Sequence, residues 1–238
     1  MYSQMLASEQ LTRDIRDIMP VEILLVNKTE LEATWDQLVR RYHYLGYTIM
    51  YGPRVKYLGL HQGEPIAAIS FNRSALKVGV RDRFIGWDDE LKQEHLKRVV
   101  CNNRFLILPW VRIPNLASHL LSQTLNHLRK DWLYLYGSKV FLVETFVDVA
   151  RYSGSSYKAD GWHCLGETQG FAKAGKNYCY HGNPKAVFVK VLDPDFRKAL
   201  GCKRDLRPLQ PRLAKGRGTE MMLAKSRTLI RTSWRPVV

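Results

Sequence analysis

The 238-residue sequence lacks any cysteine pattern that indicates a disulfide framework or a metal site. No two of its four cysteines form a C-x-x-C pair, and they stand at Cys101, Cys164, Cys179 and Cys202. A chain of this length buries enough apolar surface to fold without covalent staples. The cysteines are therefore expected to be free thiols in a reducing compartment.

Long apolar runs are also missing. The longest unbroken runs have only a few residues, as at 105–108, whereas a membrane-spanning helix needs about 20. Glu9, Arg13 and Asp14 lie where a secretory signal peptide would be apolar. We therefore expect a cytoplasmic protein without a membrane partner.

Three signatures of nucleotide-dependent and hydrolytic enzymes are absent as well. The sequence has no Gly-x-x-x-x-Gly-Lys-Ser/Thr loop, no Gly-x-Gly-x-x-Gly fingerprint and no Gly-x-Ser-x-Gly elbow. These motifs hold phosphates or expose a nucleophilic serine. ATP-driven and serine-hydrolase chemistry are therefore disfavoured.

Acidic residues are scarce relative to basic ones. The chain has 37 Lys and Arg against 22 Asp and Glu, a net charge of +15. Residues 197–238 hold twelve Lys and Arg against Asp205 and Glu220, which is +10 of that total. Evenly spread cations can follow a phosphate backbone in a salt-sensitive way, so this segment favours nucleic acid, DNA before RNA, over a merely solvated tail. The residues assigned to nucleic-acid binding are Arg41, Arg54, Lys56, Lys203, Arg204, Arg207, Arg212, Lys215 and Arg217.

Apolar periodicity predicts an α/β fold with a mixed sheet and α+β character. We divide the chain into an N-terminal arm (1–28), a core domain (29–200) and a basic C-terminal tail (201–238). A capping box at 29–32 predicts a helix that Gly46 ends. The remaining predicted elements are a hairpin at 55–71, a helix from about 88 that Asn102 and Asn103 break, strands at 104–111, 140–148 and 186–192, and a long helix at 115–136.

Two carboxylates lie on the predicted strand 140–148. Alternation places Glu144 and Asp148 on one face, about 13 Å apart and too far to share one metal ion. A carboxylate inside an apolar strand needs a partner. Glu144 is therefore a candidate base or substrate anchor, and the alternative is a structural ion pair with an arginine such as Arg104.

A basic and aromatic stretch follows the first helix. His43 can act as a general base near neutral pH, or it can simply pack beside Tyr42. Tyr44 belongs to a group of tyrosines interleaved with Arg41, Arg54 and Lys56, a mixture that nucleic-acid grooves use for stacking and phosphate binding. Asn115 and Ser118, at the start of the long helix, are a candidate anion site or an ordinary helix terminus.

Several strings in the core resemble the DruA family, which is named for a component of the Druantia anti-phage system and has relatives in and around bacterial transposable elements. The resemblance covers about residues 36–192. It is carried by the segments 41–46, 56–59, 84–87, 103–109, 115–118, 131–132, 144–148, 157–162 and 165–170. The resemblance implies a setting of mobile DNA and defence, with other subunits of such a complex as partners.

The order strand, long helix, strand and short turn is also similar to the second half of a GNAT-type N-acyltransferase. That resemblance implies a GNAT-like core in which the helix N-terminus holds an anion. Residues 112–117 have Pro114 and Asn115 where the family's phosphate loop carries its first glycine. Acyl-CoA is therefore a disfavoured cofactor.

Three functional hypotheses follow. The first is a DNA-acting protein of a mobile element or defence system, with strand cleavage or joining as a further activity and a divalent metal of unknown identity as an optional cofactor. The second is an acyltransferase, and the third is a non-catalytic nucleic-acid-binding subunit. Glu144 or Asp148 would be the metal ligand or base, Arg104 the clamp for a phosphate or carboxylate, and Tyr157 or His43 the nucleophile or proton carrier. The full set of candidate catalytic residues is His43, Tyr44, Asn103, Arg104, Glu144, Asp148 and Tyr157.

Overall fold

A computed structural model describes residues 11–174, 177–180 and 182–202 of the chain. Its helices are η1 (Ile15–Ile18), α1 (Leu31–Tyr42), α2 (Gly79–Ile85), α3 (Asp89–His95), η2 (Leu96–Arg98), α4 (Leu116–Tyr136), α5 (Ser155–Ala159) and α6 (Phe196–Ala199). Its strands are β1 (Glu22–Leu25), β2 (Arg54–His61), β3 (Glu64–Arg73), β4 (Val99–Ile107), β5 (Leu142–Val147), β6 (His163–Glu167), β7 (Phe171–Ala174), β8 (Asn177–Tyr180) and β9 (Ala186–Val191).

The strands form one seven-stranded sheet and a separate hairpin. The order in the large sheet is β1-β2-β3-β4-β5-β9-β6, and β7 pairs with β8. Neighbours in the large sheet are antiparallel except for β4 and β5, which run parallel. The predicted α/β class with a mixed sheet is confirmed.

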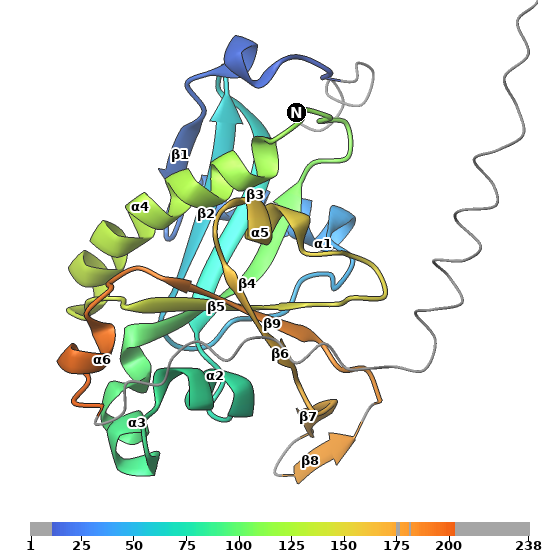
Figure 1. Cartoon of the computed structure of the whole chain (residues 1–238). Coiled ribbons are helices and arrows are strands. Elements are labelled where there is room, and N and C mark those ends of the chain that lie inside the picture. The colour runs from blue at the N-terminus through green and yellow to red at the C-terminus, as the bar shows by residue number, and fades with distance from the viewer. Residues whose placement is uncertain (1–10, 175–176, 181, 203–238) are drawn as a thin grey trace, which may run out of the picture. The chain divides into compact units, whose positions relative to one another are not determined.

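Helices α1 and α4 cover opposite faces of the first half of the sheet (Figure 1). Successive side chains of a strand point to opposite faces. On β2, Lys56 reaches Glu32 of α1, whereas Tyr57 donates its hydroxyl hydrogen to Asp131 of α4. Gly59 of β2 lets α4 pack closely on this face of the sheet, because a Cβ at this position would lie 3.2 Å from a methyl carbon of Leu120.

A second apolar cluster lies under the other half of the sheet. Phe84 of α2 stacks on Phe196 of α6 with ring centroids 6.1 Å apart. Leu142 of β5 and Val189 of β9 belong to this cluster, whereas Val143 belongs to the main core. Adjacent residues of β5 therefore face different layers, and this alternation decides which of its side chains can reach a site.

The start of the chain and of β4 differ from the sequence predictions. Residues 1–28 were predicted to form an arm, but β1 pairs along β2, and Ile18 and Val26 are fully buried. Asn102 and Asn103 were predicted to break a helix. They instead lie inside β4, because the apolar residues that precede them, 99–101, are buried in the sheet. The predicted basic tail, from residue 203 onward, lies outside the described residues.

The predicted capping box forms only in part. Glu32 reaches back and accepts from the backbone N–H of Lys28 at 2.7 Å. Thr29, however, donates its hydroxyl hydrogen to the carbonyl oxygen of Val26 instead of capping the first turn. Helix α1 also ends at Tyr42, four residues before Gly46, so His43 and Tyr44 lie on the loop that follows it.

Candidate functional site

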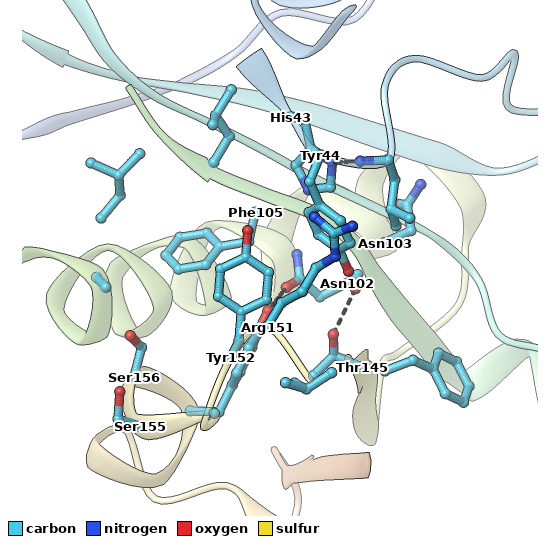
Figure 2. A pocket seen from close by; sticks show the side chains of 18 of the residues that line it. His43, Tyr44, Asn102, Asn103, Phe105, Thr145, Arg151, Tyr152, Ser155 and Ser156 are labelled. Atoms are coloured by element: carbon cyan, nitrogen blue, oxygen red, sulfur yellow. Dashed lines mark hydrogen bonds between the residues drawn. The ribbon is translucent and has the colours of Figure 1, made fainter. Parts of the chain in front are cut away.

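A pocket opens where the two parallel strands separate. Strand β4 pairs with β5 only over residues 99–101 and 142–144. Beyond this point the space between the strands is a cavity of about 450 Å³, lined by β4, β5, the loop after α1, the first turn of α4 and residues 151–157. Figure 2 shows the side chains of this pocket. Ligand pockets in proteins run from about 300 to 1,000 Å³, so the cavity can hold a small molecule or one unit of a polymer.

A β-bulge shapes the β4 wall of the pocket. Ser70 of β3 pairs with Arg104 and Phe71 pairs with Asn102, so Asn103 is the extra residue. A bulge bends its strand and redirects a side chain, and bulges are frequent beside functional sites. Asn103 lines the pocket, where its Oδ1 accepts from Ser70 at 2.9 Å. Its Nδ2 has the thioether of Met50 as its one partner among the residues that the structure describes.

Asn102 ties the separated strands to α5. Its Nδ2 donates to the carbonyl oxygens of Ser70 and Arg104. The Tyr157 hydroxyl donates to its Oδ1 at 2.8 Å, and the Thr145 hydroxyl of β5 donates to its carbonyl oxygen at 2.9 Å (Figure 2). The side-chain polar atoms of Asn102, Thr145 and Tyr157 all form hydrogen bonds, which holds these three residues, the pocket floor, rigid. Burial raises the pKa of Tyr157 above its ordinary value, so its hydroxyl keeps its proton at neutral pH.

Aromatic rings and an arginine meet at the pocket rim. Tyr44 stacks on His43 with centroids 4.9 Å apart and contacts the tilted ring of Tyr152 at 5.2 Å. The Arg151 guanidinium lies 5.5 Å from the centre of the Tyr44 ring (Figure 2). Tyr152 is 51% exposed and the Arg151 side chain 61% exposed. These four residues, which we call the rim, present stacking faces and a cation to solvent.

His43 is a neutral hydrogen-bond donor in this setting. The backbone N–H of Leu45 donates to its Nδ1 at 3.2 Å, which leaves the ring proton on Nε2. Desolvation, together with the positive charge of Arg104, lowers the pKa of His43 to about 4. At neutral pH the ring is therefore uncharged, with its Nε2–H available to a ligand.

The lowered pKa of His43 predicts a pH-dependent stability. An unfolded chain takes up this proton near pH 6.5 and the folded chain only near pH 4, so folding stability should fall as pH drops through that window and should not fall further through this residue below pH 4. His43→Gln should flatten the pH profile of urea unfolding between pH 6.5 and 4. The exposed His127→Gln is the control, and identical profiles for His43→Gln and the unmodified chain would contradict the assignment.

Further arginines surround the loop that carries His43 and Tyr44. Arg41 is exposed and lies 5.2 Å from the centre of the Tyr42 ring. Arg104 holds the loop by donating to the carbonyl oxygen of Gly46 at 3.0 Å and to the Thr48 hydroxyl at 3.1 Å. Arg41 and Arg104 thus lie beside the loop without lining the pocket, and Asp148, at 3.5 Å, partly offsets the charge of Arg151.

Four of the seven candidate catalytic residues line the same pocket, namely His43, Tyr44, Asn103 and Tyr157. Arg104 and Asp148 lie outside its lining. Arg104 positions the loop beneath His43 and Tyr44, whereas Asp148 forms an ion pair with Arg151 and accepts from the backbone N–H of Ala150. These two residues support the rim and do not face the cavity.

Glu144 points away from the pocket, toward α2. Its Oε2 accepts from Arg81 Nη1 at 2.8 Å and its Oε1 from the backbone N–H of Ala75 at 3.0 Å. Both Glu144 and Arg81 are fully buried. Burial raises the pKa of Glu144 although Arg81 opposes the shift. The ion pair predicted as the alternative role is thus present, but its partner is Arg81 and not Arg104.

Lys56 is buried and does not lie on the surface where nucleic acid could contact it. It is only 2% exposed, and its Nζ donates to Glu32 at 2.8 Å and to Asp36 at 2.5 Å. Its charge is neutralised inside the molecule, which corrects its assignment as a phosphate contact. Arg54 is half-buried at the start of β2, where its backbone pairs with the Tyr136 hydroxyl. The six predicted contacts from 203 to 217 lie outside the described residues.

The predicted anion site at α4 is an exposed helix terminus. Asn115 has a left-handed backbone with φ of 64°, and its carbonyl oxygen accepts from the Ser118 hydroxyl at 3.0 Å.

Among the residues that the structure describes, no three His, Cys, Asp or Glu side chains gather closely enough to hold a metal ion. Likewise, no helix in the described ranges is long and apolar enough to cross a membrane.

The sequence predictions omitted Asn102, Thr145, Arg151 and Tyr152. Arg151 and Tyr152 come three and four residues after the end of the predicted strand 140–148, and they repeat the basic and aromatic pairing seen at 41–44. That repetition was a usable signal. Asn102 and Thr145 carried none, because their roles arise from the bulge and from the separation of β4 and β5.

Comparison with known proteins gives one family match. The family model described as Druantia protein DruA matches residues 1–200. None of the curated proteins is similar enough to count as a match.

Several solved structures are similar to this chain. One is the aminoglycoside acetyltransferase AAC(6')-Ib in complex with coenzyme A, at 15% identity and a TM-score of 0.46, covering 75% of this chain and 99% of that one. Another is an N-acetyltransferase from Staphylococcus aureus Mu50, at 11% identity and a TM-score of 0.45, covering 72% and 97%. A third is Escherichia coli ElaA, at 14% identity and a TM-score of 0.41, covering 71% and 99%.

Proposed function

This chain belongs to the DruA family, named for a component of the Druantia anti-phage system, and we propose that it is the subunit that recognises nucleic acid in such a defence complex. Single-stranded nucleic acid is the form that the rim suits best. Unstacked bases bind to aromatic faces, and the adjoining phosphates bind to arginines.

The observation that carries this proposal is the composition of the rim. Tyr44 and Tyr152 expose rings next to the guanidinium of Arg151, and Arg41 lies in the last turn of α1, just before the loop that carries Tyr44. The exposed groups are thus stacking faces and cations, the two features that binding a single strand requires. The basic segment after residue 200 supplies further charge in the sequence, and we propose it as a second, non-specific phosphate contact.

Substitutions in the rim test the proposal. Tyr152→Ala in the full chain should weaken binding of a single-stranded DNA or RNA oligomer about tenfold, because one stacked base loses its platform. Arg151→Met should also weaken binding and should flatten the dependence of affinity on salt between about 50 and 200 mM. Fluorescence anisotropy with a labelled oligomer measures both effects.

Tyr134→Ala is the matched control for the loss of an exposed aromatic side chain. Tyr134 is 89% exposed on α4 and does not line the pocket, so its removal should leave binding unchanged. If the unmodified chain binds no oligomer at low salt, or if Tyr152→Ala and Tyr134→Ala bind equally well, the proposal is wrong. Adding Mg²⁺ or Mn²⁺ to the same mixtures tests whether this chain by itself cleaves the strand, the further activity that we propose for it.

Acyl transfer from coenzyme A is the second candidate function. The observation in its favour is at the α4 terminus, where Asn115 adopts the left-handed conformation that a phosphate-loop glycine would take, and where Ala117 lines the pocket. Titrating coenzyme A into the anisotropy assay separates the candidates. Competition with the oligomer would show that the two bind at overlapping sites, whereas saturable coenzyme A binding in a separate calorimetric titration, without oligomer binding, would favour the acyltransferase.

A further inference from the structure

We propose that the pocket behind the rim holds one unpaired nucleobase, inserted between β4 and β5 with a keto oxygen facing Asn103 and His43. This inference rests on the proposed function, since it names the part of the nucleic acid that the pocket would take. The rim would then bind the neighbouring base and phosphate, so that one nucleotide is turned inward from the strand.

The walls of the cavity fit a flat aromatic ring. Phe105 and Tyr157 have ring centroids 6.1 Å apart at an angle of 60°, and both line the pocket together with the apolar Leu106 and Ala117. Tyr157 is fixed by its hydrogen bond to Asn102 and by stacking on Phe188 at 5.9 Å. A fixed aromatic wall costs little conformational entropy when a base stacks on it. The volume of about 450 Å³ suits one nucleotide and is too small for a base pair within a duplex.

The polar groups left for a ligand in the cavity include two donors with fixed roles. Asn103 Nδ2 has two hydrogens, and the thioether of Met50 at 3.1 Å is only a weak acceptor for one of them. His43 donates through Nε2, because the N–H of Leu45 occupies its Nδ1. Donors of this kind pair with keto oxygens on the edge of a base. A base with keto oxygens therefore accepts hydrogen bonds from Asn103 and His43, which would otherwise donate only to water.

The chemistry of the pocket also distinguishes base binding from charge attraction. Arg151, which forms an ion pair with Asp148, lies at the rim, whereas the other residues that line the pocket are neutral at pH 7. A strand held only through its phosphates would contact the rim and leave the interior empty. The two modes differ in whether the base itself contributes affinity.

An oligomer without bases tests the inference. Full-length protein is titrated with oligothymidylate and with an oligomer of the same length made of abasic sugar phosphates. We expect oligothymidylate to bind at least about a hundredfold more tightly, about tenfold from the base stacked at the rim and about tenfold from the base buried in the pocket. Ala117→Trp, which fills the cavity, should reduce this difference to the part that base stacking at the rim contributes, and so should Asn103→Asp, which replaces the donor by an acceptor of the same shape. Ser122→Trp on an exposed turn of the same helix should preserve it.

The outcomes separate the two proposals. A thymidylate preference that Ala117→Trp and Asn103→Asp leave undiminished would overturn the base pocket and leave nucleic-acid recognition at the rim intact. Equal affinity of the unmodified protein for the two oligomers would overturn both the pocket and base stacking at the rim. Absence of binding to either oligomer would overturn the proposed function and the pocket together. Thermal unfolding of each variant shows whether it is folded. If Ala117→Trp does not fold, the result for Asn103→Asp alone tests the base pocket.

Discussion

Glu144→Gln should lower the free energy of unfolding by about 3 kcal/mol, because it leaves the guanidinium of Arg81 buried without its full counter-charge. Arg81 is completely buried, and its Nη1 donates hydrogen bonds to Glu144 Oε2 and to the carbonyl oxygen of Ala75, both at 2.8 Å. Asp82 accepts from the other side of the guanidinium, so part of the charge stays compensated. Urea unfolding monitored by tryptophan fluorescence measures the loss.

This prediction separates a structural role for Glu144 from a catalytic one. If Glu144 were catalytic, its substitution would abolish activity while the free energy of unfolding changed little. The buried pair predicts the reverse, and the double variant Arg81→Met with Glu144→Leu should recover much of the stability that Glu144→Gln loses. Asp89→Asn serves as the control, since Asp89 forms an exposed ion pair with Lys92 and its removal should change little. An unfolding midpoint for Glu144→Gln that matches the control would contradict the structural role.

Gly154→Ala should cost about 3 kcal/mol of stability and should also weaken nucleic-acid binding. Gly154 has a φ of 68°, and a Cβ at this position would lie 2.6 and 2.9 Å from two carbons of the Phe188 ring. The ring must move, and Phe188 supports Tyr157 in the pocket floor. The substitution therefore disturbs both the packing of β9 and the wall against which a base would stack.

Gly137→Ala isolates the backbone contribution. Gly137 has a similar φ of 61°, but no atom lies within 4 Å of the position that its Cβ would occupy. Its substitution should cost about 1 kcal/mol, from the left-handed backbone alone. The difference between the two variants measures the Phe188 contact. Equal losses of stability, with unchanged oligomer binding by Gly154→Ala, would show that the pocket floor tolerates the displacement.

Local patterns in the sequence predicted most of the elements that build the pocket. The long helix, the hairpin and the strand that carries Glu144 are where periodicity and turn residues place them, because a face of apolar residues must be buried whatever its partner is. The segment 41–47 was singled out by its arginines and tyrosines, although it was predicted to be the end of a helix and its residues after Tyr42 form a loop. Short elements that depend on long-range pairing, such as β1 and the start of β4, were not predicted, since edge and bulged strands have weak periodicity.

Charge and aromatic content belong to the sequence alone: the excess of +15, its concentration after residue 196 and the tyrosine-rich loop are all present in the unfolded chain. The tertiary structure decided which of these groups remain available. Folding pairs Glu144 with Arg81 and encloses Lys56 between Glu32 and Asp36, while it brings Arg151 and Tyr152 to Tyr44. The reason is that a charged side chain is either neutralised inside or solvated outside according to what the chain path places beside it, and residue spacing along the chain does not contain that path.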